Sequence, residues 1–355
     1  MNPLTTSIST SDRTRIANLW LDDGNLVIAA GSHLFRVHRS IMSMHSAVFR
    51  DMLSCPPSES QDMYEGVPLL ELLDDGEEVK YFLTALYLPE QFPLIPERCV
   101  LPFKALIGAL RLSHKYDVPF LRRRALRVFS AEYIMDVNKL AKCPLPRWRS
   151  TPGMAWLGIT FDQDQWKQVQ EELLLAREVG ALWVLPQLLY EASYAPVSML
   201  RSSRLDRAEI LACYAGYHAT RTMAPSHFEC KTSTCTSDRW NTFVDDAKSI
   251  TKPGFVFDPT SARYSGRMCR VCTALYIEKL GEWRKDFWSR IPEFYGIPCW
   301  EDLKEMKEKA LEVSPATDTV LNGHSYTAQG ALVNRDIDSS LSRIFYYALD
   351  ESFTI

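Results

Sequence analysis

The chain has 355 residues, of which 46% are hydrophobic and 24% charged, a composition that excludes a mostly disordered protein. Lys and Arg number 40 against 44 Asp and Glu, and the formal net charge of -4 argues against nucleic acid as a general partner. No apolar run reaches the length of a membrane-spanning helix, and the Ser/Thr-rich start lacks the blocks of a secretory signal.

The first elements in the chain predict a β-hairpin followed by helix. Residues 26–28 form an apolar run with β-branched side chains, Gly31 and Ser32 suit a type II′ turn, and residues 34–37 predict the returning strand. Ser40 is expected to cap the next helical stretch, because its hydroxyl can accept a hydrogen bond from a free backbone N–H. The apolar residues at helical spacing after it are Ile41, Met44, Val48, Phe49, Met52 and Leu53.

A third strand and three helices follow. Residues 67–72 predict the strand, and the acidic run 74–78 predicts a helix start, where the helix dipole favours negative charge. Two more helices are expected over 103–115 and 120–133. One face of the first of the three helices carries Val79, Phe82, Leu83, Leu86 and Tyr87.

The N-terminal block resembles the BTB/POZ domain, on the runs 23–28, 35–40 and 46–53. The resemblance implies an α+β fold with a short mixed sheet capped by helices, followed here by a mainly helical domain. It also implies a non-catalytic protein-interaction module that often self-associates. More loosely, the remainder is similar to the helical, cysteine-bearing half of many fungal BTB proteins, including the run 185–190.

The resemblance points to an interaction site at one corner of this block. Dimeric relatives form a charged pocket from an Asp in the first strand and an Arg that follows a His. Arg39 matches the Arg and follows His38, whereas the Asp position falls on Asn25, and Asp23 lies two residues away. We therefore name Asp23, Asn25, His38 and Arg39 as interaction residues, and expect His38 to bond backbone at a strand-to-helix junction rather than to react.

The organisation predicted for the whole chain is a flexible tail over 1–17, a BTB/POZ-like domain over 18–138, a linker over 139–164, a helical domain over 165–312 and an extension over 313–355. The helical domain begins with an amphipathic stripe, which consists of Trp166, Val169, Leu173 and Ala176. Its later helices are expected after Pro186, over 205–222 and from Met268 onward.

Two cysteine pairs predict a structural zinc site. Cys230 with Cys235, and Cys269 with Cys272, can close a tetrahedral thiolate shell around Zn²⁺, and His227 could replace one cysteine. The alternatives are a core role for Cys272 with Cys230 and Cys235 exposed in a loop, or a redox pair at Cys269 and Cys272. A shell of four protein ligands leaves no position for water, so the site would stabilise structure rather than catalyse.

Two further clusters have structural interpretations. The basic run 122–124 with Arg127 is expected to form a solvated helix face, since nucleic-acid binding would favour interleaved aromatic residues. Trp283, Phe287 and Trp288, with Trp300 nearby, are expected to pack a helix core, with a partner groove as the alternative.

The function expected from the sequence is that of a scaffold or adaptor that is not an enzyme, because no nucleophile elbow, phosphate loop, dinucleotide fingerprint or zinc-protease motif is found. We expect protein partners, including a second copy of the chain, in the cytoplasm or nucleus, with no membrane, nucleic-acid or small-molecule partner.

One alternative is a substrate adaptor of a cullin-type ubiquitin ligase. Such relatives carry an apolar-x-Glu motif after the second helix. Here residues 51–57 lack that motif. The sequence Leu-Pro-Glu at residues 88–90 matches it, but lies after a later helix. A zinc-dependent nucleic-acid-binding regulator is the other alternative.

Overall fold

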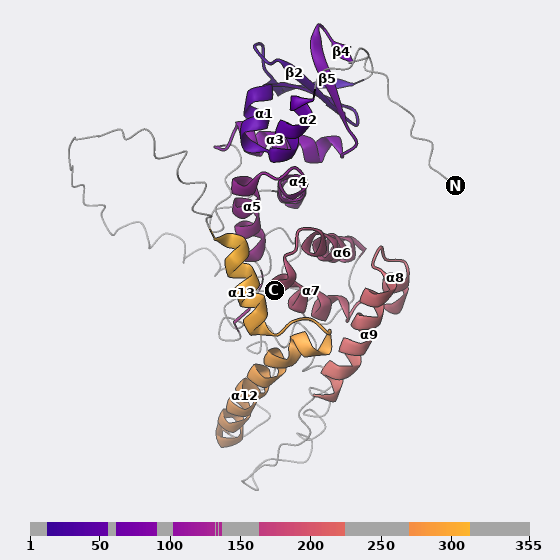
Figure 1. Ribbon diagram of the computed structural model, residues 1–355. Helices are drawn as coiled ribbons and strands as arrows, with labels where there is room; N and C mark the ends of the chain where they lie inside the picture. The colour runs from indigo at the N-terminus through magenta and orange to yellow at the C-terminus, as the bar shows by residue number, and fades with distance from the viewer. Residues whose placement is uncertain are drawn as a thin grey trace, which may run out of the picture. The chain divides into compact units, whose positions relative to one another are not determined.

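The computed structural model describes residues 13–55, 62–90, 102–131, 133, 135–136, 163–223 and 270–312 (Figure 1). Its N-terminal part combines a small mixed sheet with helices, and the part that follows is helical. This arrangement confirms the α+β fold class expected from the sequence.

One five-stranded sheet organises the N-terminal part. Its strands are β1 (Thr14–Trp20), β2 (Leu26–Ala30), β3 (His33–Val37), β4 (Met63–Tyr64) and β5 (Val67–Leu72), and their order across the sheet is β1-β3-β2-β5-β4. The β1–β3 and β2–β5 pairs are parallel, whereas the β2–β3 and β4–β5 pairs are antiparallel.

The predicted hairpin is confirmed, and its two strands pair in one continuous register. Leu26 lies opposite Val37 and Ala30 opposite His33, so the two strands pair over their whole length. Gly31 has a φ of 50°, in the left-handed region that a tight hairpin turn requires and that glycine adopts without a steric penalty.

The helical stretch after the hairpin is two helices, and the predicted cap at Ser40 is wrong. Helix α1 (Arg39–His45) follows His38, and helix α2 (Ala47–Ser54) follows Ser46. Ser40 lies inside α1, whereas Ser46 has an extended backbone and its Oγ accepts a hydrogen bond from Phe49 N at 2.9 Å. Met44, in the last turn of α1, has 67% of its surface exposed.

The remaining N-terminal helices lie close to their predicted positions. They are α3 (Gly76–Tyr87), α4 (Phe103–Lys115) and α5 (Pro119–Ala131). Asp75 caps α3, since its Oδ1 accepts hydrogen bonds from Glu77 N at 3.0 Å and Glu78 N at 3.1 Å. Figure 1 shows α1, α2 and α3 against one side of the sheet, where the first hydrophobic core buries Phe35, Phe49 and Phe82.

The helical part contains α6 (Gln163–Glu178), a short 3-10 turn η5 (Leu182–Val184), α7 (Leu185–Ala192), α8 (Val197–Arg201), α9 (Arg207–Thr222), α12 (Arg270–Phe294) and α13 (Trp300–Leu311). All four members of the predicted stripe that begins at Trp166 are buried. Pro186 lies in the first turn of α7, as predicted, and Asp206 with Glu209 forms a capping box at the start of α9. Among the described helices, none has an apolar stretch long enough to cross a membrane.

Helices α4 and α5 contribute to two cores at once. Ala109 and Leu112 of α4 belong to the first core, whereas Leu110 of α4 and Phe129 of α5 belong to the second core, which they share with α6, α7, α9, α12 and α13. The aromatic residues Phe287, Trp288 and Trp300 are buried in this second core, as the packing interpretation expected. The helix pair therefore joins the sheet-bearing part to the helical part.

Candidate functional site

The four residues predicted to form an interaction site come together where β3 ends and α1 begins. Asn25 directly precedes β2, and its Oδ1 accepts a hydrogen bond from Arg39 N at 2.8 Å. His38 Nε2 lies 3.1 Å from Asp23 Oδ1. We call Asp23, Asn25, His38 and Arg39 the corner site.

A fifth residue, Tyr87 of α3, completes the corner. Its hydroxyl accepts a hydrogen bond from His38 N at 3.0 Å and lies 3.4 Å from His38 O, to which it can donate. The rings of Tyr87 and His38 are stacked, with centroids 6.2 Å apart and an interplanar angle of 23°. Burial raises the pKa of Tyr87 to about 12, so its hydroxyl keeps the proton that it donates. The sequence placed Tyr87 on the inward face of its helix and did not predict this contact.

The comparison with known families agrees with this geometry. Residues 23–129 match the BTB/POZ domain family. The N-terminal part is a BTB/POZ domain. This confirms the resemblance expected from the sequence, whereas the likeness of the remainder to fungal BTB proteins stays a prediction. No curated protein and no solved structure matches the chain. BTB/POZ domains are protein–protein interaction modules, so the chain has protein partners.

The charged pocket of dimeric BTB/POZ relatives takes a different form here. The Arg39 guanidinium donates from Nη2 to Leu53 O at 2.6 Å, near the end of α2. The Asp23 carboxylate faces His38 instead, and within the described residues it makes no ion pair with Arg39. The guanidinium of Arg39 therefore bonds backbone rather than a carboxylate within the described residues.

The imidazole of His38 faces a carboxylate side chain, whereas the sequence led us to expect a bond to backbone. Its Nε2 faces Asp23, whose side chain is 86% exposed, while His38 itself is 21% exposed. Its Nδ1 is buried and has no hydrogen-bond partner among the residues that the structure describes.

Exposed apolar side chains lie on the two helices next to the corner site. Met44 of α1 is 67% exposed and Met52 of α2 is 38% exposed. Methionine side chains of this kind adapt to varied partners and are enriched in protein interfaces. We call Met44 and Met52 the methionine surface.

The predicted zinc ligands are not placed by the structure. Cys230, Cys235, Cys269 and His227 lie outside the described residues, and Cys272 lies on α12 with an undescribed side chain. The part of the chain that is described holds no group of three or more side chains suited to a metal ion. The zinc site therefore stays a prediction.

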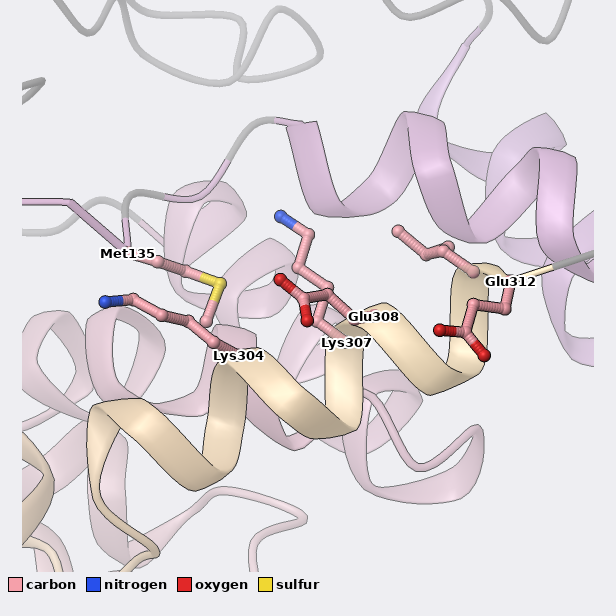
Figure 2. Close-up of a pocket in the computed structure, with 6 residues that line it drawn as sticks. Met135, Lys304, Lys307, Glu308 and Glu312 are labelled. Atoms are coloured by element: carbon pink, nitrogen blue, oxygen red, sulfur yellow. The ribbon is translucent and has the colours of Figure 1, made fainter.

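A cleft of about 530 Å³ lies along α13, lined by Met135 and by residues of that helix (Figure 2). Its lining mixes Lys304 and Lys307 with Glu308 and Glu312, as Figure 2 shows. The two lysines are balanced by two glutamates, so the lining as a whole selects neither an anion nor a cation.

Proposed function

We propose that this protein is a non-catalytic scaffold or adaptor whose BTB/POZ domain binds a second copy of the chain or another protein. The observation that carries this proposal is the BTB/POZ domain itself, with a rigid corner site beside an exposed methionine surface. The expected absence of an enzymatic reaction belongs to the same proposal.

The hydrogen bonds of the corner site support docking rather than chemistry. Asn25 bonds the backbone of Arg39, Tyr87 bonds the backbone of His38, and Arg39 bonds the carbonyl of Leu53. A reaction centre would hold an acid or base within reach of a substrate atom, whereas these groups hold the junction of β3, α1 and α2. A surface fixed in this way loses little conformational entropy when a partner binds.

The test of self-association uses light scattering with size-exclusion chromatography on the full-length protein. We expect a dimer at micromolar concentration that Met44→Asp converts to monomer, because a carboxylate would be buried in the interface without a partner. Met63→Asp is the matched control, since Met63 is also exposed, at 54%, but lies on β4. A wild-type protein that is monomeric up to high micromolar concentration would remove self-association from the proposal.

A substrate adaptor of a cullin-type ubiquitin ligase is the second candidate. Residues 88–90 directly follow α3 and have the sequence Leu-Pro-Glu. Pro89 and Glu90 are exposed, so a partner can reach their side chains. A pull-down of the full-length protein with a cullin scaffold separates the two candidates. Retention that Glu90→Ala abolishes would support the adaptor, and no retention of the wild type would count against it.

A further inference from the structure

Three arginines of the BTB/POZ domain contact the helical part of the chain. Arg111 of α4 donates from Nε to Glu178 Oε2 at 2.8 Å and lies 3.8 Å from Glu171 Oε2, both on α6. The same guanidinium pairs with Glu78 of α3, so it links three helices. Its side chain is 21% exposed, and the pairs are therefore partly shielded from water.

The other two arginines belong to the basic run of α5. Arg122 donates from Nη2 to Val179 O at 2.8 Å, directly after the last residue of α6. Arg127 donates from Nη2 to Leu311 O at 3.1 Å, and Leu311 is the last residue of α13. A helix C-terminus has free carbonyl groups and a negative dipole end, which a guanidinium satisfies.

These contacts refine the interpretation of the basic run as a solvated face, because Arg124 and Arg127 are exposed whereas Arg122 and Arg123 are half-buried. Arg122 and Arg127 are each engaged by a helix end of the helical part, and Arg122 also donates to His114 Nδ1 at 3.2 Å. By contrast, Arg124 is exposed and has no hydrogen bond or ion pair to any described residue. The members of the run therefore have different roles that their sequence spacing does not separate.

We propose that Arg111, Arg122 and Arg127 form a clamp that holds the ends of α6 and α13 against the BTB/POZ domain in one fixed orientation. Two of the three bonds end on helix carbonyls, and the third on a carboxylate of the last turn of α6. The clamp fixes the spacing between a partner bound to the BTB/POZ domain and any surface of the helical part.

The shared core alone does not account for these bonds. Leu110 and Phe129 already pack α4 and α5 against the helical part, but apolar contacts are not directional. Charged donors aimed at single carbonyl oxygens require one orientation of the two helix ends. The clamp therefore adds orientation to an attachment that the core provides.

The test is hydrogen exchange, read by mass spectrometry, on the full-length double variant Arg122→Gln/Arg127→Gln. We expect amides in the last turns of α6 and α13 to exchange roughly tenfold faster than in the wild type. In the wild type each charged hydrogen bond stabilises one helix end, and the variant lacks both bonds. Amides of the β2–β3 hairpin should exchange at the wild-type rate. The matched control is Arg123→Gln/Arg124→Gln, which removes the same charge from the same helix and should match the wild type throughout.

Two results would overturn the clamp. One is a double variant whose α6 and α13 ends exchange as slowly as those of the control. The other is an equal acceleration in the β2–β3 hairpin, which would mean a general loss of stability.

Arg111→Gln leaves Glu78, Glu171 and Glu178 facing one another and could prevent folding. The single variant Glu178→Gln tests the contact between Arg111 and Glu178 instead. We expect amides at the end of α6 to exchange faster in this variant, and an unchanged exchange rate would contradict the role of this contact.

Discussion

Ser46 shows how much depends on one hydroxyl group. Only 2% of the residue is exposed, its Oγ accepts from Phe49 N, and its hydroxyl donates to Tyr116 O from a distant part of the chain. One side chain therefore starts α2 and ties it to the segment between α4 and α5.

Replacing Ser46 by Ala should destabilise the protein by roughly 1–2 kcal/mol, since it removes a helix cap and leaves a buried carbonyl without its donor. Ser40→Ala is the matched control, because Ser40 is exposed inside α1 and should change the free energy of unfolding by less than about 0.5 kcal/mol. Urea unfolding of the full-length variants gives both values. Equal effects of the two substitutions would contradict the assignment of the cap to Ser46.

The sequence could predict that a serine caps a helix here, but not which serine. Ser40 and Ser46 carry the same side chain before similar apolar patterns, and the difference lies in the extended backbone at Ser46 and in Tyr116, 70 residues away. Local patterns thus predict elements, whereas contacts distant in sequence set their limits.

At the scale of elements, Tyr87 joins α3 to the junction of β3 and α1. The phenol is half-buried, and this burial raises its pKa from 10 to about 12. In the unfolded chain it ionises near pH 10, whereas in the folded protein it keeps its proton. The unfolded state therefore binds fewer protons above pH 10, and the stability that depends on the neutral phenol is lost as pH rises from 10 toward 12.

Tyr87→Phe should remove this part of the alkaline loss of stability, and should also destabilise the protein at pH 7 through the loss of the bond to His38 N. The measurement is urea unfolding of wild type and variant between pH 7 and 11.5, with the difference in unfolding free energy plotted against pH. Other buried tyrosines, such as Tyr190 and Tyr295, titrate alike in both proteins and cancel in the difference. A difference that does not shrink above pH 10 would contradict the buried, neutral state of Tyr87.

Helix α4 shows why the sequence could predict an element without its partners. The span 103–115 is the one predicted, yet residues 105–110 are all buried, on every side of the helix. A helix buried all round packs against more than one layer, and periodicity identifies only the dominant face. The corner site was likewise predicted only in part. Its four residues came from a family resemblance, whereas Tyr87 joined them only through the packing of α3.

At the scale of the whole molecule, the two cores share one helix pair. A fragment that ended after α5 would leave Leu106, Leu110 and Phe129 without the helical part that covers them. The surface thus exposed would favour non-specific association. Oligomeric state is therefore a property to measure on the full-length protein, where that surface is occupied.

The predicted zinc ligands differ from the cysteines whose side chains the structure describes. Among the described cysteines, Cys55 and Cys299 are exposed and Cys213 is buried. Burial raises the pKa of Cys213 to about 12, which keeps it a neutral thiol and makes it a poor metal ligand.

Metal analysis of the full-length protein, purified under reducing conditions without chelators, should find one zinc per chain. The double variant Cys269→Ser/Cys272→Ser should lose the metal and unfold at lower temperature, because a structural zinc site contributes its binding free energy to folding. The matched control, Cys55→Ser/Cys299→Ser, removes two exposed thiols and should retain both the metal and the melting temperature. A wild-type protein without metal would contradict the zinc site, and retention of zinc by the first double variant would contradict the assignment of Cys269 and Cys272 as ligands.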